Sequence, residues 1–312
     1  MVESLSSYGH VICSWLLFFA QDTFMELVGE NRMGGKAMNV KDCPLLTVEK
    51  IEKDLVTYLS SIGNIFTVFD QQDSGCISYG VQAAEQHWFV KYSENSEAIE
   101  YMKNAEAIHR EVAHLQMPKL LNAFTTDLGF ALVYEWVDGE VLGTPAFPGK
   151  EGRNQPESPY FRFRQLPLSK VIAALNTVYD VHAYLERKGY VAVDFYDGGM
   201  IYDFDRNELH LCDFDCYTKG PFILEMDRLF GSSRFMAPEE FVRGSQIDHL
   251  TNVYTMGAAA FVFLADEGGR ELRDWRASEA LYHVARKAAS PERSERYGSV
   301  HAFYRAWLEA QN

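Results

Sequence analysis

Basic residues are scarce in this sequence. There are 29 lysines and arginines against 44 aspartates and glutamates, and the formal net charge is -15. Because an acidic chain is repelled by polyanions, we expect neither nucleic acid nor an anionic membrane surface as the main partner. The bulk charge does not exclude a local basic patch.

Cysteines and long apolar runs are also scarce. The 5 cysteines are an odd number and show no spacing typical of a zinc site, so we expect reduced thiols in a cytoplasmic protein. Residues 11–20 form the only long apolar run, which is too short to cross a bilayer. Glu3 stands where a signal peptide would carry basic residues, so no membrane association is predicted.

Residues 1–40 are interpreted as an N-terminal extension of the folded body. Three readings stay open for it: a helix that docks on the body, a disordered segment, or the product of a start codon assigned too early. Met33 and Met38 are the alternative starts in the last case.

The periodicity of apolar residues predicts an α+β fold. Residues 64–92 are rich in β-branched and aromatic residues and read as three strands, and residues 130–137 as a further, buried strand. The Gly- and Pro-rich segment 144–159 is typical of a loop. Helical spacing is found in residues 47–63, 96–115 (with Ser96 as N-cap), 168–189 (ending at Gly189), 247–265, 277–289 and 298–310.

Two carboxylates follow short predicted strands in the second half of the chain. Asp194 lies in GYVAVDFYDGGMIYDF (189–204), and Asp213 lies in HLCDFDCY (210–217). A single aspartate of this kind is usually a turn residue. The segment GSSRFMAPEEF (231–241) then carries an Ala-Pro-Glu string at positions 237 to 239.

In this order, the motifs of residues 60–312 resemble those of protein kinases, most closely divergent bacterial Ser/Thr protein kinases. The resemblance implies a bilobal α+β fold, with a small β-rich N-lobe (41–137) and a mainly helical C-lobe (138–312). It also implies ATP and Mg²⁺ as cofactors and a hydroxyl group of a protein substrate as acceptor.

The resemblance assigns roles to the charged residues of the expected site. Lys91 in WFVKY would bind the ATP phosphates, and Glu106 on the following helix would pair with it, with Glu111 as the rival. Asp194 would orient the acceptor hydroxyl and take its proton, and Asp213 would hold Mg²⁺.

The nucleotide-binding residues are assigned in the same way. Gly75 matches the last glycine of the Gly-rich loop, and Ile77 would cover the adenine. The other loop glycines are replaced by Asp70 and Gln72. In LVYEWVDGE (132–140), the backbone of Glu135 and Val137 would meet the adenine edge, with Tyr134 as the bulky gatekeeper.

Several positions depart from the family pattern. Gly199 replaces the metal-binding asparagine, and Asp197 on the same loop is the expected substitute ligand. Tyr196 replaces the catalytic-loop lysine. Asp215 replaces the glycine after Asp-Phe, where an extra carboxylate would either bind metal or stiffen an inactive loop.

The family pattern also predicts structural roles outside the site. Glu239 would pair with an arginine between the last two helices, Arg296 or else Arg293. Asn252 stands at the start of the central helix, where the family has an aspartate.

Three functions therefore stay open. The first is a Ser/Thr protein kinase, supported by Lys91, Asp194 and Asp213 together. The second is a pseudokinase acting as an interaction module, supported by the altered loops. The third is a small-molecule kinase of the aminoglycoside or choline type, which the Ala-Pro-Glu segment disfavours. The segment 144–170 is rich in cations, which either form a solvated surface or favour an acidic protein substrate or a phosphoprotein: Lys150, Arg153, Arg162, Arg164 and Lys170.

Overall fold

The computed structural model describes residues 43–70, 74–266 and 269–312. The expected extension 1–40, Cys13 and Gln72 lie outside these residues. Cys43, Cys76, Cys212 and Cys216 are buried and form no disulfide bond with one another. Among the helices of the described part, none combines the length and apolar character that a membrane crossing requires.

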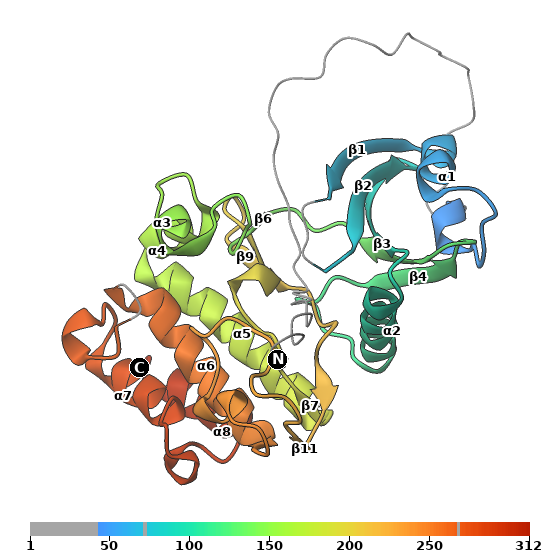
Figure 1. The fold of residues 1–312 in the computed structure, drawn as a ribbon. Helices are drawn as coiled ribbons and strands as arrows, with labels where there is room; N and C mark the ends of the chain where they lie inside the picture. The colour runs from blue at the N-terminus through green and yellow to red at the C-terminus, as the bar shows by residue number, and fades with distance from the viewer. Residues whose placement is uncertain (1–42, 71–73, 267–268) are drawn as a thin grey trace, which may run out of the picture.

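The first half of the described chain forms an antiparallel five-stranded sheet in the order β1-β2-β3-β5-β4 (Figure 1). Its strands are β1 (Asn64–Phe69), β2 (Ile77–Ala83), β3 (Gln86–Ser93), β4 (Leu120–Thr125) and β5 (Phe130–Glu135). The three predicted strands in 64–92 and the strand near 130 are confirmed, whereas β4 was not predicted from its sequence LLNAFT.

Two helices cover the opposite faces of this sheet. Helix α1 (Leu55–Ile62) begins after its N-cap Asp54, later than predicted, and buries Leu55 and Leu59 among sheet residues. Helix α2 (Ser96–Glu111) packs on the other face. Its N-cap is Asn95 rather than Ser96, because the Asn95 side chain accepts two hydrogen bonds from the first turn. The side chains of successive strand residues alternate between the two faces.

The second half of the described chain is mainly helical and lies beside the sheet (Figure 1). Its helices are α3 (Gly149–Arg153), α4 (Pro159–Gln165), α5 (Leu168–Arg187), α6 (His249–Leu264), α7 (Glu279–Ala288) and α8 (Val300–Glu309). Short strands connect them: β6 (Glu140–Val141), β7 (Tyr190–Val191), β8 (Met200–Asp203), β9 (Glu208–Leu211), β10 (Thr218–Lys219), β11 (Phe222–Ile223) and β12 (Gln246–Ile247).

Helix α6 lies at the centre of this helical part. Almost all of its residues are buried, and it packs against α5, α7 and α8. The predicted helices near 168–189, 247–265, 277–289 and 298–310 are confirmed. The segment predicted as a loop (144–159) contains the short helix α3. The α+β class predicted from the sequence is therefore confirmed.

Candidate functional site

Lys91 on β3 is a buried lysine, with a side chain only 1% exposed. Phe89, two residues earlier, packs in the apolar cluster that includes α2. Since alternate strand residues share a face, Lys91 points from the sheet toward the same side. A buried ammonium group is costly unless carboxylates compensate its charge.

Two carboxylates provide this compensation. Asp215 accepts a hydrogen bond from the Lys91 ammonium group, and the Asp213 Oδ1 lies 3.7 Å from it. All three side chains are at most 3% exposed. The structure thus brings together Lys91 and Asp213, as expected, and adds Asp215 as the nearer partner.

The glutamates expected to pair with this lysine have other partners. Glu106 forms an ion pair with Arg110 one helical turn away, at 2.5 Å. Glu111 accepts hydrogen bonds from Tyr190 and Lys219, each at 2.8 Å. This corrects the expected pairing, because the intrahelical arginine takes Glu106 while Asp215 reaches the lysine from the loop after β9.

Asp213 and Asp215 lie on a loop that α2 holds in place. The side-chain amide of Asn104 on α2 donates hydrogen bonds to the carbonyls of Asp215 and Tyr217, at 2.7 and 2.9 Å. Asp213 has a backbone φ of +64°, a left-handed conformation that is uncommon for residues other than glycine. Strained backbone of this kind is found preferentially at functional sites.

Asp194 follows β7 and, like Asp213, has a left-handed backbone conformation, with a φ of +63°. It is 7% exposed, and among the described residues no hydrogen-bond partner reaches either of its carboxylate oxygens. Burial raises the pKa of Asp194 well above its usual value, and the negative charges of Asp213 and Asp215 raise it further. A buried acceptor without a partner is a position that a substrate group or cation can satisfy.

The backbone leading to Asp194 is fixed by Asn252 of α6. Its side-chain oxygen accepts a hydrogen bond from the Ala192 amide at 2.8 Å, and its amide group donates one to the Tyr190 carbonyl at 3.0 Å. Asn252 thus connects the central helix to the segment that carries the carboxylate.

Asp197, the expected substitute metal ligand, is engaged elsewhere. Its buried carboxylate accepts a hydrogen bond from Arg234 at 2.5 Å. Within the described residues, no group of three or more histidine, cysteine, aspartate or glutamate side chains is arranged to hold a metal ion. The Arg234 guanidinium therefore occupies one side of Asp197, whereas Asp215 lies with Asp213 at the Lys91 ammonium group.

Gly199 packs tightly on the strand that leads to Asp213. A Cβ atom at Gly199 would lie 2.9 Å from the Cys212 carbonyl oxygen, while the Gly199 carbonyl accepts a hydrogen bond from the Cys212 amide at 3.0 Å. This close approach accounts for glycine at position 199.

The expected nucleotide-binding residues lie at or next to the ends of strands β2 and β5. Gly75 precedes β2 with a φ of +71°, and its carbonyl accepts a hydrogen bond from Ser93. Ile77 begins β2 and is 38% exposed. Glu135 ends β5, and Val137 follows it, partly buried against the α2 side of the sheet.

The Ala-Pro-Glu segment is anchored as predicted. Glu239 accepts hydrogen bonds from Arg296 at 2.6 and 2.9 Å and from Arg293 at 2.5 Å, so both candidate arginines bind it. The preceding chain touches the site, since a Cβ atom at Gly231 would lie 3.5 Å from the Asp194 Cα.

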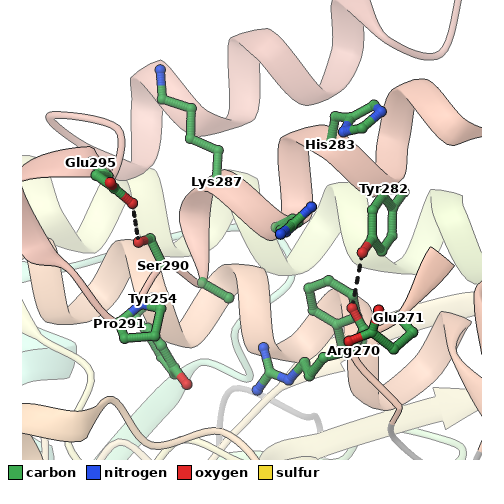
Figure 2. A pocket seen from close by; sticks show the side chains of 12 residues that line it. Tyr254, Arg270, Glu271, Tyr282, His283, Lys287, Ser290, Pro291 and Glu295 are labelled. Atoms are coloured by element: carbon green, nitrogen blue, oxygen red, sulfur yellow. Dashed lines mark hydrogen bonds between the residues drawn. The ribbon is translucent and has the colours of Figure 1, made fainter.

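A pocket of about 590 Å³ lies away from these carboxylates, between α6, α7 and the loop that follows α7 (Figure 2). Tyr282 there donates a hydrogen bond to the Arg270 carbonyl, and Ser290 donates one to Glu295. None of the residues assigned from the sequence lines this pocket. Its size alone does not make it the candidate site.

Sequence reasoning missed Asn104 and Arg234 and left the role of Asp215 open. The extra carboxylate at position 215 was a visible signal, whereas nothing near Asn104 or Arg234 in the sequence indicates their contacts. No protein-family model matches this chain, and no curated protein matches it by sequence.

Proposed function

We propose that this protein is an ATP- and Mg²⁺-dependent kinase that transfers a phosphoryl group to a Ser or Thr hydroxyl of a protein substrate. In this proposal, residues 41–137 and 138–312 are the two lobes of a protein-kinase-like fold. One observation carries it: the buried lysine on β3 lies 3.7 Å from Asp213, and the charge of Asp213 helps to raise the pKa of the buried Asp194.

The charges of the site fit Mg²⁺ and nucleotide phosphates. Lys91 pairs with both Asp213 and Asp215, and the pKa of Asp194 is raised first by burial and then by the negative charges of these two aspartates. A divalent cation with a preference for oxygen ligands would relieve the repulsion among these negative charges. Asp213 and Asp215 are the residues that would hold it, and Lys91 would contact phosphate oxygens. When bound, Mg²⁺ supplies charge neutralisation on the β- and γ-phosphates.

Asp194 has the properties of a proton acceptor in this reaction. As the hydroxyl oxygen of the substrate bonds to the γ-phosphorus, the bond from this phosphorus to the bridging oxygen breaks, and its electron pair leaves with ADP. The hydroxyl proton passes to the Asp194 carboxylate. Burial makes this carboxylate more basic, and its oxygens, which have no hydrogen-bond partner among the described residues, can receive a hydrogen bond from the hydroxyl.

The test is Asp194→Asn, measured as transfer of labelled phosphate from ATP to Ser- and Thr-containing peptides. We expect transfer to fall by about 100-fold or more, as for loss of a general base, with ATP binding retained. Asp180→Asn is the matched control, since Asp180 is exposed on α5 and lies outside the site. Turnover by Asp194→Asn equal to that of wild type would remove the proposed role.

A pseudokinase is the second candidate, and two contacts favour it. The Lys91 ammonium group, which would have to bind the phosphates, already donates a hydrogen bond to Asp215. Arg234 likewise donates a hydrogen bond to Asp197. Absence of any ATP binding would select this candidate. A small-molecule kinase is disfavoured because Glu239 of the Ala-Pro-Glu segment is anchored by two arginines.

A further inference from the structure

Arg228 is an exposed arginine on the segment between β11 and the Ala-Pro-Glu string. Its Nη2 donates a hydrogen bond to the Gly231 carbonyl at 2.7 Å and contacts the Met236 sulfur at 3.5 Å. The guanidinium carbon lies 5.5 Å from the centre of the Phe241 ring. These contacts fix the position of the guanidinium group at an exposed point of the surface.

The residues that anchor Arg228 also border Asp194, the proposed catalytic residue. A Cβ atom at Gly231 would lie 3.5 Å from the Asp194 Cα and 3.4 Å from the Met236 Cγ. Gly231 thus contacts Asp194 with its own backbone and Arg228 through its carbonyl group. A hydroxyl group bound at Asp194 would therefore lie next to the segment that presents this arginine.

The Arg228 guanidinium group keeps donors for a ligand. A guanidinium group has several N–H donors, and the hydrogen bonds of Arg228 to protein atoms involve Nη2 alone. The neighbouring acid, Asp227, pairs with Arg243 at 3.0 Å instead. Within the part of the chain that the structure describes, no carboxylate forms an ion pair with Arg228. An anion from outside the chain can therefore take this place.

The charge of Arg228 also acts on the proposed site. Burial raises the pKa of Asp194, and neighbouring carboxylates raise it further, whereas the Arg228 charge opposes this shift. Burial likewise raises the pKa of Glu240 to about 8, and Arg228 again opposes the shift. Arg228 is thus close enough to Asp194 for its charge to act on a group bound there.

We propose that Arg228 binds an anionic side chain, carboxylate or phosphoryl, near the acceptor residue of the substrate, and so selects acidic or already phosphorylated sequences. Guanidinium groups bind both kinds of anion through charge-assisted hydrogen bonds. An extended peptide advances roughly 3.3–3.6 Å per residue, so a side chain within about three residues of the acceptor can reach the segment beside Asp194. This inference rests on the proposed kinase function for the identity of the occupant.

The first test is binding of fluorescent peptides to the full chain, measured by anisotropy without ATP. The peptides share one Ser acceptor and carry Gln, Glu, phosphoserine or Lys at neighbouring positions. We expect wild type to bind the best anionic peptide about threefold to fivefold more tightly than the Gln peptide, as for one exposed ion pair, and Arg228→Gln to bind both equally. Arg305→Gln makes the same change of charge on exposed α8 and should keep the preference. No preference in wild type, or equal loss in Arg305→Gln, would overturn the inference.

The second test reverses the charge in the same assay. Arg228→Glu should bind the Lys peptide more tightly than the Glu peptide, because the attraction becomes a repulsion. Loss of the Gly231 and Met236 contacts alone would produce no such reversal. A larger preference of wild type for phosphoserine than for Glu indicates a phosphoprotein substrate, and equal preferences indicate an acidic one. A preference of Arg228→Glu for the Glu peptide would overturn the inference.

Transfer of phosphate from ATP separates this inference from the kinase proposal. In wild type, kcat/KM for the peptides should follow the order of their binding, and Arg228→Gln should lose this order. Transfer to all peptides without such an order would overturn the role of Arg228 alone. An Arg228-dependent preference in binding, without transfer to any peptide, would instead contradict the kinase proposal.

Discussion

Arg296→Met tests how the Ala-Pro-Glu segment is held. The Arg296 side chain is fully buried, donates two hydrogen bonds to Glu239 and donates others to the carbonyls of Ser290 and Leu250. Removing one partner of a buried ion pair costs about 3–5 kcal/mol, because the other charge stays buried. Arg293 also binds Glu239, so we expect the lower end, about 3 kcal/mol of unfolding free energy.

The assay is urea unfolding at pH 7, followed by tryptophan fluorescence. The double variant Glu239→Leu/Arg296→Met should be less destabilised than the sum of its single variants, because neither charge is left behind. Arg305→Met is the control: its pair with Glu309 is exposed, and we expect a change within about 0.5 kcal/mol. A loss of unfolding free energy for Arg296→Met as small as that for Arg305→Met would refute the reasoning. So would a double variant that is destabilised by the full sum of its two single variants.

Two further predictions concern the helical core and the strand before Asp213. Burial lowers the pKa of His182 to about 4. The neutral His182 side chain therefore stabilises the folded protein fully above pH 6.5, and this stabilisation is lost as the pH falls toward 4. The difference in unfolding free energy between wild type and His182→Met should therefore fall by about 3 kcal/mol from pH 7 to pH 4, and a pH-independent difference would contradict this. Gly199→Asn should destabilise by about 1–3 kcal/mol without raising activity, because its Cβ would meet the Cys212 carbonyl. Gly298→Asn, at a position with open space, is the control, and equal stability of both variants would contradict the packing argument.

The elements with strong periodicity could be predicted from the sequence. Helix α5 and the three strands β1–β3 appear where apolar spacing places them. Strand β4 was missed because LLNAFT is short and has no clear alternation of apolar and polar residues. Its place at the sheet edge depends on pairing with β5, which is a tertiary contact.

Side-chain partners could be predicted only where the family pattern specifies them. The pairing of Glu239 with Arg296 is confirmed. The structure does not show the expected pairing of Lys91 with Glu106, because the spacing of the glutamates does not reveal that Arg110 pairs with Glu106 and that Asp215 pairs with Lys91. The position of Arg153, Arg234 and Arg270 around one pocket could not be predicted either, since Arg234 and Arg270 lie far along the chain from Arg153.

The central claim is that Lys91, Asp213 and Asp215 form a nucleotide–metal site. Its most direct test is the thermal unfolding temperature with ATP, with and without Mg²⁺, for wild type, Asp213→Ala and the control Asp205→Ala, at an exposed turn. Ligand at 100 times its Kd stabilises by about 2.7 kcal/mol, which raises the unfolding temperature by several degrees. We predict a Mg²⁺-dependent rise in wild type and Asp205→Ala that is lost in Asp213→Ala. No rise in any of them, or an equal rise in Asp213→Ala, would contradict the claim.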